Sequence, residues 1–209
     1  MTILLSDPQV HDVPVHDDGE PMVLLDASFG PAYAAVRASL AQRLLLARDR
    51  LPAGVGLRVA DGHRSLADQQ AIIAGYAAQL SRLHPGVDAD TLERLTSRFV
   101  APVAVAPHVA GAAVDITLAS TVDGRELDLG TPIDATPEQS CGACYFDAPQ
   151  VTGRARANRD LLARVLSGVG LVNYPTEWWH WSYGDRYWAL VTGAPAARYG
   201  PVSARLVLA

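Results

Sequence analysis

Two short segments of the chain combine residue types that could carry out metal-dependent chemistry. One runs from His108 to Asp115, and the other is the run of four residues from Glu177 to His180. Two histidines and one carboxylate can supply three ligands to a divalent metal ion and leave a fourth position open for water. A catalytic zinc site has this arrangement, whereas a structural zinc site is normally closed by four protein ligands. We therefore predict a zinc hydrolase with His108, Asp115 and His180 as the metal ligands.

The position of Glu177 suggests a second role at the same site. Glu177 lies three residues before His180, so its carboxylate can reach the zinc-bound water without occupying the metal. A carboxylate in that position can take the proton of the attacking water and pass it to the leaving amine. Taken alone, Asp115 could be a strand-end cap and Glu177 a solvated charge. The joint pattern favours the catalytic interpretation.

The predicted ligands need strands to bring them together. Residues 112–118 are rich in β-branched side chains and are expected to form a strand from which Asp115 projects. Gly111 gives the backbone the freedom to turn after His108. A neighbouring strand later in the chain could then place His180 beside Asp115.

The remaining pattern predicts an α+β domain. Helical spacing and capping residues, including Ser65 with Asp68, indicate helices, while β-branched and aromatic runs indicate strands. The expected helices cover 31–50, 65–83, 90–98 and 154–166, and the expected strands cover 56–60, 112–118, 178–183 and 186–190. Because helices come first and strands gather later, we expect an antiparallel sheet with helices packed on one side.

Length and composition set the broad class. The 209 residues, 49% of them hydrophobic and 19% charged, predict one globular domain over 1–209, with an N-terminal arm or loop over 1–23. A net charge of −5 argues against nucleic acid or an anionic membrane as the partner. No apolar run is long enough for a membrane span, and no signal peptide is recognisable, so a cytoplasmic protein is expected. The oligomeric state is left open.

The two cysteines stand close together as Cys141 and Cys144. We interpret them as two reduced thiols in a loop. A redox pair or a second zinc site is the alternative, but no other Cys or Cys/His pair stands nearby to complete a metal site.

The two metal segments together resemble the VanX-type D-alanyl-D-alanine dipeptidases of the M15 zinc peptidases, which share a fold with the Hedgehog signalling domain. The family pattern is Ser-x-His-x-x-Gly-x-x-x-Asp, followed late in the chain by Glu-x-Trp-His, with an arginine ahead of both. The chain matches it at His108, Gly111, Asp115, Glu177, Trp179 and His180. The resemblance implies a Hedgehog/DD-peptidase-like fold, one catalytic Zn²⁺ and hydrolysis of a small dipeptide such as D-Ala-D-Ala.

The resemblance also implies roles for further residues. Arg64 stands at the family's arginine and would stabilise the oxyanion that develops on the substrate. Asp134 closes a loop that is similar to the family's substrate-binding loop, where its carboxylate would hold the substrate's ammonium group. Trp179 would contribute to substrate binding.

Two positions depart from the family pattern. Ala106 occupies the place of the serine that helps to hold the substrate's amino end, and Ser65 follows Arg64 where the family usually has proline. Both changes leave the metal ligands intact and put the exact dipeptide and its stereochemistry in question. The biological role, whether resistance, recycling or another, is also left open.

Three other functions fit part of the pattern. The first is a related M15 D,D-carboxypeptidase or endopeptidase that acts on cell-wall peptides. The second is a non-catalytic zinc-binding Hedgehog-like module, against which the presence of both Glu177 and Arg64 argues. The third is a non-haem iron oxygenase, which also uses two histidines and a carboxylate but normally spaces the first two ligands by two residues rather than seven.

Overall fold

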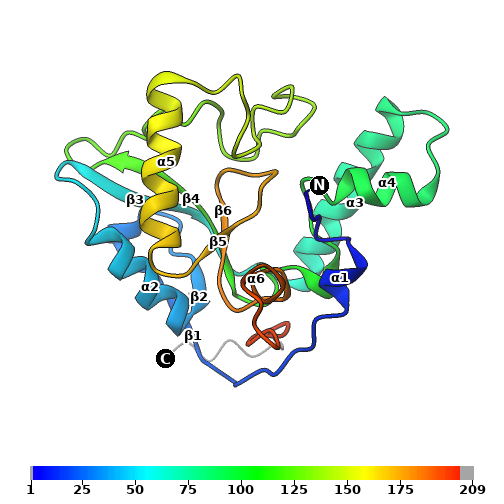
Figure 1. Cartoon of the computed structure of the whole chain (residues 1–209), viewed down its shortest axis with the longest axis horizontal. Coiled ribbons are helices and arrows are strands. Elements are labelled where there is room, and N and C mark those ends of the chain that lie inside the picture. The colour runs from blue at the N-terminus through cyan, green and yellow to red at the C-terminus, as the bar shows by residue number, and fades with distance from the viewer. Residues whose placement is uncertain (1, 203–209) are drawn as a thin grey trace.

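A four-stranded antiparallel sheet forms the centre of the computed structural model, which describes residues 2–202 (Figure 1). Its strand order is β3-β4-β6-β5, and the strands are β3 (Val55–Asp61), β4 (Ala113–Ser120), β5 (Val172–Asn173) and β6 (His180–Ser182). A small second sheet pairs β1 (Met22–Leu24) with β2 (Ala35–Arg37). All of these neighbouring strands are antiparallel, as the sequence predicts.

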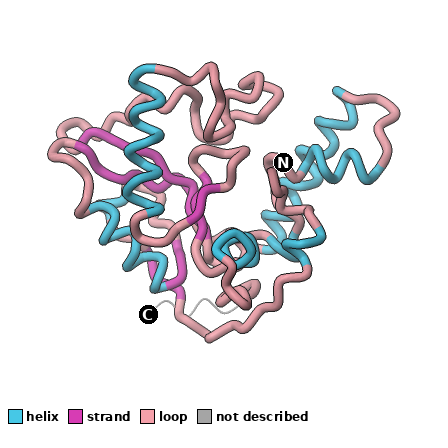
Figure 2. Tube along the Cα trace, viewed as in Figure 1, coloured by secondary structure: helices cyan, strands magenta, loops and turns pink. Residues whose placement is uncertain are grey.

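The helices divide into two groups. The helices α2 (Ala38–Arg48) and α5 (Gly153–Ser167) lie beside the central sheet, which confirms the α+β class (Figure 2). The helices α3 (Leu66–Leu83) and α4 (Ala89–Thr96) form a separate pair on the other side of the molecule (Figure 1). The short helical segments are α1 (Pro8–His11), α6 (Arg186–Thr192), η1 (Ala27–Phe29) and η2 (Val103–Val105). None of the helices among residues 2–202 is long and apolar enough to cross a membrane.

Strand β4 separates the hydrophobic core from the polar face of the sheet. Because successive side chains of a strand point to opposite faces, its even-numbered and odd-numbered residues have different surroundings. The even-numbered residues pack with α2 and α5 in the largest core cluster, which includes Leu40, Leu44, Val114, Ile116, Leu118, Leu162 and Leu166. Asp115 and Thr117 point to the opposite face, where they are equally buried. The strand can therefore carry a carboxylate without interrupting the core.

The capping signal before α3 is confirmed. The Ser65 hydroxyl accepts a hydrogen bond from the Asp68 amide (3.1 Å) and donates one to the Asp68 carboxylate (2.6 Å). This reciprocal arrangement satisfies an amide that would otherwise lack a partner in the first turn.

Two predicted elements are wrong. The helix expected over 31–50 begins only at Ala38, because residues 35–37 pair with β1 as a strand. The strand expected over 186–190 is helix α6. Its first turn is capped by Asp185, whose carboxylate accepts from the amides of Tyr187 (2.8 Å) and Trp188 (3.1 Å). Aromatic content suggested a strand there, but a capping aspartate outweighs that weak preference.

The strand expected over 178–183 is shorter than predicted. Residues 178 and 179 form a turn, and only His180–Ser182 pairs as β6. The partner strand β5 has just two residues and is absent from the predicted elements. Short pairs of this kind depend on tertiary contacts more than on local sequence.

The N-terminal residues do more than form an arm along the surface. Residues 2–21 contain α1 and one isolated bridge between Val15 and Ala197. Leu5 and Val10 are buried in a small cluster with Tyr174 and Tyr187. The beginning of the chain therefore lies against segments near its end.

Candidate active site

The register of the central sheet places three polar residues in one row. Asp61 of β3 pairs with Asp115 of β4, and Asp115 pairs with His180 of β6. Cross-strand partners point to the same face, so the three side chains lie side by side on the face opposite α2 and α5. A register shift between Val59 and Asp61 brings Asp61 into this row. The expectation that a neighbouring strand places His180 beside Asp115 is confirmed.

His108 reaches the same point from a turn just before β4. The turn closes with a hydrogen bond from the Gly111 amide to the His108 carbonyl (3.0 Å). Gly111 has φ of +64°, and a Cβ atom there would lie 2.5 Å from the sulfur of Met22. The backbone conformation therefore favours glycine, and any larger residue would also have to displace the Met22 side chain.

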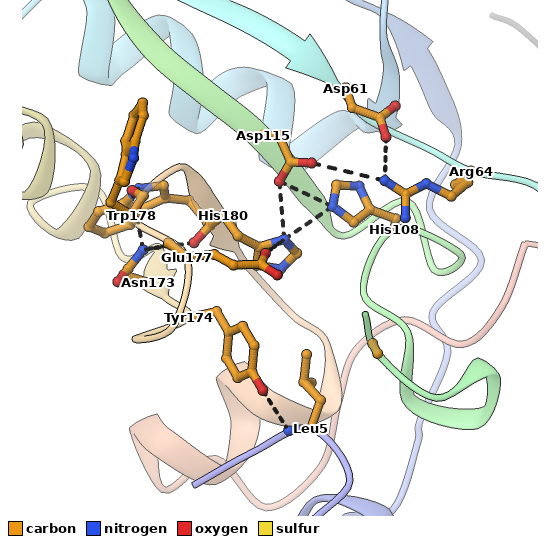
Figure 3. A network of polar contacts seen from close by, with 12 residues as sticks. Leu5, Asp61, Arg64, His108, Asp115, Asn173, Tyr174, Glu177, Trp178 and His180 are labelled. Carbon is orange, nitrogen blue, oxygen red and sulfur yellow. Dashed lines mark hydrogen bonds and ion pairs between the residues drawn. The ribbon is translucent and has the colours of Figure 1, made fainter. Parts of the chain in front are cut away.

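The three predicted ligands form a small triangle (Figure 3). Nε2 of His108 lies 3.1 Å from Nδ1 of His180, and Oδ1 of Asp115 lies 3.3 Å and 3.2 Å from these two nitrogens. A tetrahedral ion with ligands at about 2.0 Å holds them about 3.3 Å apart. The triangle thus has the size that a zinc-like ion requires. Among residues 2–202, these three side chains form a group whose ligand atoms lie close enough together to share one metal ion.

The tautomer of His108 also suits metal binding. Its Nδ1 lies 2.6 Å from the carbonyl oxygen of Gly62. Because a carbonyl can only accept, Nδ1 carries the proton and Nε2 directs a lone pair into the triangle when the ring is neutral. A backbone carbonyl behind a ligating histidine is a common way of fixing its orientation.

The electrostatics of the triangle favour an ionised carboxylate. Burial opposes ionisation of Asp115, but the two histidines outweigh it and hold the pKa of Asp115 well below its usual range. Burial lowers the pKa of His180, although its hydrogen bond to Asp115 acts in the opposite direction. Burial alone would also lower the pKa of His108, but Asp115 raises it. Asp115 is therefore the negative charge around which the site is organised.

Glu177 lies beside the triangle rather than in it. Its Oε2 is 3.8 Å from Nδ1 of His180, and its side chain is buried. Burial first, and then the charges of Asp115 and Asp134, raise the pKa of Glu177 well above its ordinary value. A carboxylate with a raised pKa next to a cation site has the properties of a proton acceptor that can also release the proton.

Arg64 approaches the triangle from the other side. Its guanidinium donates to Asp61 (2.7 Å) and to Gln69 (3.0 Å), and lies 4.0 Å from the second oxygen of Asp115. The Arg64 amide donates to the His108 carbonyl (3.2 Å), which ties the two segments together. Arg64 is thus a fixed positive charge at the edge of the triangle (Figure 3).

These side chains line one cavity of about 400 Å³, within the usual range for small-molecule sites. Asp134 and Trp179 also line it, so every residue that the sequence singled out contributes to the same space. Trp179 is fully buried and packs edge to face against Trp178 at 5.4 Å. Ala106 lines the cavity next to Pro107, with its side chain buried.

Asp134 stands at the solvent-exposed edge of the cavity. Its φ of +64° lies in the left-handed region, which aspartate adopts more readily than most non-glycine residues. The protein atoms around its carboxyl group, and the charge of Asp115, raise the pKa of Asp134. Farther along the same loop, Glu138 pairs with Arg98 and accepts from Tyr76 (2.6 Å). The loop is therefore tied to the α3–α4 pair across the cavity.

The base of this loop is held by one buried arginine. Arg159 of α5 donates to the carbonyl oxygens of Leu129 (2.7 Å), Ala143 (2.7 Å) and Tyr145 (2.6 Å). These carbonyls come from both ends of the loop, so one guanidinium sets its shape. The free thiols of Cys141 and Cys144 lie within the same loop, the first exposed and the second buried.

Several cavity residues were not singled out by the sequence, and three of them make polar contacts there or come from distant segments. Tyr174, Gln69 and Leu5 all line the cavity. Tyr174 lies three residues before Glu177, and this short separation could have indicated that its side chain lies near the cavity. Gln69 and Leu5 carried no such signal, because an isolated amide on a helix and a leucine near the chain start are common everywhere.

A buried set of two histidines and one aspartate, with a further carboxylate beside it in the same cavity, has the composition of a metal-dependent hydrolase site. The family model for peptidase M15, described as D-Ala-D-Ala dipeptidase, matches residues 40–193. The chain therefore belongs to the M15 family of metallopeptidases. This confirms the resemblance noted in the sequence.

Curated relatives support the same family. D-alanyl-D-alanine dipeptidases from Synechocystis sp. and Escherichia coli are 35% and 37% identical over 95 and 73 residues, or 42% and 35% of this chain. These alignments span only 38% and 35% of the two relatives. The enzyme of the same name from Enterococcus faecium is 27% identical over 152 residues, which cover 70% of this chain and 71% of that one.

Solved structures share the fold. VanYB in complex with D-Ala-D-Ala superposes with a TM-score of 0.52 at 17% identity, over 83% of this chain and 84% of the other. A VanY D,D-pentapeptidase variant in complex with Zn(II) superposes with a TM-score of 0.52 at 14% identity, over 91% and 96%. The expected Hedgehog/DD-peptidase-like fold is confirmed.

Proposed function

We propose that this protein is a zinc-dependent dipeptidase that hydrolyses D-Ala-D-Ala. The observation that carries the proposal is the triangle of His108, Asp115 and His180 with Glu177 beside it in one cavity. Family membership and the relatives named D-alanyl-D-alanine dipeptidase support the substrate class. The Zn(II) in the structurally similar VanY variant supports the choice of metal.

The residues of the chain then take separate roles. A zinc ion held by His108, Asp115 and His180 would supply a Lewis acid that lowers the pKa of water toward about 7. Glu177 accepts a proton from the attacking water and delivers it to the leaving amine. Its buried position and raised pKa suit both transfers, since a carboxylate with a raised pKa takes up a proton more readily and holds it until the amine leaves.

Arg64 stabilises the negative charge that develops on the substrate's carbonyl oxygen. The guanidinium remains charged at any working pH, and its bonds to Asp61 and Gln69 hold it in place. A donor fixed before the reaction needs no reorganisation when the charge appears, which is why such groups lower barriers.

Asp134 anchors the free amino group of the substrate at the outer edge of the cavity. Its carboxylate is an acceptor suited to an ammonium ion, and binding a cation would offset the repulsion from Asp115 that raises its pKa. Trp179 contributes a fixed apolar surface next to the metal ligands. An anchor for a free amino terminus favours dipeptides over internal bonds of long chains.

Activity on free and blocked peptides tests the proposal. Purified protein with zinc would be assayed against D,D-, L,D- and L,L-dipeptides and against N-terminally blocked tripeptides. We expect amino acids to be released from free D-Ala-D-Ala and the blocked peptides to remain intact. Cleavage of blocked peptides without any action on dipeptides would favour the cell-wall carboxypeptidase or endopeptidase function instead.

A further inference from the structure

The N-terminal segment contributes a side chain to the active-site cavity. Leu5 lines the cavity, yet only 2% of its surface is exposed. Its amide donates to the hydroxyl of Tyr174 (3.1 Å), and that hydroxyl donates to the carbonyl of Ser97 (2.5 Å). The next amide, of Ser6, donates to the Ser97 hydroxyl (2.8 Å). Leu5 is thus held in a defined position by the backbone and is not a loosely placed terminal residue.

The hydrogen bond to the Leu5 amide comes from the same segment that carries Glu177. The Glu177 amide donates to the Tyr174 carbonyl (2.9 Å), and the Tyr174 ring meets the His180 ring edge-on at 6.1 Å. Figure 3 shows Tyr174 between Leu5 and His180. Leu5 therefore lies one aromatic ring beyond the metal ligands, in the lining of the same cavity.

The lining of the cavity combines two kinds of side chain. Asp61, Arg64 and Asp115 are charged and close enough to Asp134 to act on its carboxyl group. Apolar side chains also line the cavity, namely Leu5, Ile72, Phe99, Val100, Ala101 and Ala106. Leu5 shares a buried cluster with Val105, the residue before Ala106, and Ala101 packs against the same cluster. An ammonium group fits beside the carboxylates of the lining, and an alkyl side chain fits beside its apolar residues.

We propose that Leu5 is a specificity-determining residue that forms part of the wall of an apolar subsite. This subsite takes the aliphatic side chain of one residue of the substrate and limits it to the size of alanine. The inference rests on the proposed dipeptidase function and adds which side chains the enzyme accepts. Removing methylene groups from such a wall opens space for a longer substrate side chain, and one methylene in an apolar pocket typically changes selectivity by about tenfold or more.

Variants of opposite size at position 5 test this subsite. Leu5→Ala enlarges it and Leu5→Phe fills it, and both would be assayed with D-Ala-D-Xaa and D-Xaa-D-Ala, where Xaa lengthens from alanine to 2-aminobutyrate to norvaline. In one of the two series, we expect Leu5→Ala to raise kcat/KM for norvaline relative to alanine by about tenfold or more. Leu5→Phe should lower kcat/KM even for D-Ala-D-Ala. Which series responds identifies the substrate residue that occupies the subsite.

Leu4→Ala is the matched control. Leu4 packs against the same small cluster but does not line the active-site cavity. It should leave the norvaline-to-alanine ratio unchanged, while thermal unfolding shows whether the segment remains in place. The proposal is overturned if Leu5→Ala and Leu5→Phe lower kcat/KM by the same factor for all substrates. It is also overturned if Leu4→Ala changes the norvaline-to-alanine ratio as much as Leu5→Ala does. In either case Leu5 has only a structural role.

Binding measurements separate this inference from the proposed function. The same two dipeptide series would be titrated calorimetrically into zinc-loaded Glu177→Gln protein, with leucine or alanine at position 5. A change in the norvaline-to-alanine affinity ratio supports the subsite even if the native protein turns over no dipeptide. An unchanged ratio overturns it even if the native protein hydrolyses D-Ala-D-Ala efficiently. Failure of every dipeptide to bind overturns both.

Discussion

The cavity has two walls that are built in different ways. The sheet wall carries Asp115 and His180 on paired strands, in a row fixed by strand register and backed by the main core. The facing wall is assembled from distant segments: the N-terminal segment with Leu5, the turn with Ala106 and the loop with Asp134. The sheet wall carries two of the family's metal residues, and the third, His108, lies in the turn before β4. The departure at Ala106 lies in that same turn, outside the strands. Substrate preference can thus change through residues outside the strands while the metal residues are preserved.

The largest effect should come from breaking the sheet wall at the metal. His180→Ala removes a ligand and leaves Asp115 buried beside one histidine, so zinc content and activity should fall together. Loss of one partner of a buried pair should also cost about 3 kcal/mol of stability. Zinc analysis, turnover and thermal unfolding check this. His63→Ala is the control, since His63 lies next to Arg64 but outside the triangle. Full zinc content and turnover in His180→Ala would place the site elsewhere.

A second change should separate chemistry from metal binding on the same wall. Glu177→Gln keeps the shape of the side chain and removes its charge, so kcat should fall by at least about 10²-fold while zinc stays bound. Because burial disfavours the charged form of Glu177, the neutral amide should not lower stability. Steady-state kinetics and zinc analysis on the same preparation measure both effects. Turnover near that of the native protein would remove Glu177 from its role as the base.

Arg64 lies where the two walls meet, and its replacement should mainly affect the rate. Arg64→Ala should lower kcat by about 10²-fold with a smaller rise in KM, because the oxyanion forms only on the way to the transition state. Arg58→Ala is a suitable control, since Arg58 pairs with Glu126 away from the cavity. A rise in KM at unchanged kcat would show that Arg64 binds the ground state instead.

On the facing wall, the loss of Asp134 should affect binding more than chemistry. Asp134→Asn keeps the size of the side chain and removes the charge that attracts the ammonium group. Because Asp134 is partly open to solvent, we expect KM for D-Ala-D-Ala to rise by about tenfold at similar kcat. Glu126→Gln is the control, since Glu126 bridges to Ala119 of β4 and does not line the cavity. If the kcat of Asp134→Asn falls as far as that of Glu177→Gln, the division between the two walls does not hold.

The smallest effect should come from restoring the family's serine. Ala106→Ser adds one hydrogen-bond partner for the substrate, worth about 0.5–1.5 kcal/mol, so kcat/KM for D-Ala-D-Ala should rise about two- to tenfold. Ala104→Ser, at an exposed position of η2, adds a hydroxyl that cannot reach the cavity. Equal behaviour of the two variants would mean that the added hydroxyl does not reach the substrate.

Local sequence predicted those elements whose ends carry their own signals. Ser65 and Asp68 identify the start of α3, and the β-branched run before Ser120 identifies β4, because caps and side-chain packing act over a few residues. The same reasoning failed for α6, where aromatic side chains masked the capping role of Asp185. It also missed β5, whose two residues form a strand only because β6 lies beside them.

The sequence by itself determined which residues can carry out the chemistry: the spacing of His108, Asp115, Glu177 and His180 left few other interpretations. Tertiary structure alone decided how they meet. Antiparallel register places Asp115 beside His180, although 65 positions separate them along the chain. Long-range packing also decided that Leu5 lines the cavity, where the Tyr174 hydroxyl holds it across 169 positions. Residue type decides which side chains can bind a metal. Strand register and long-range packing are set only when the whole chain folds and buries its apolar surface.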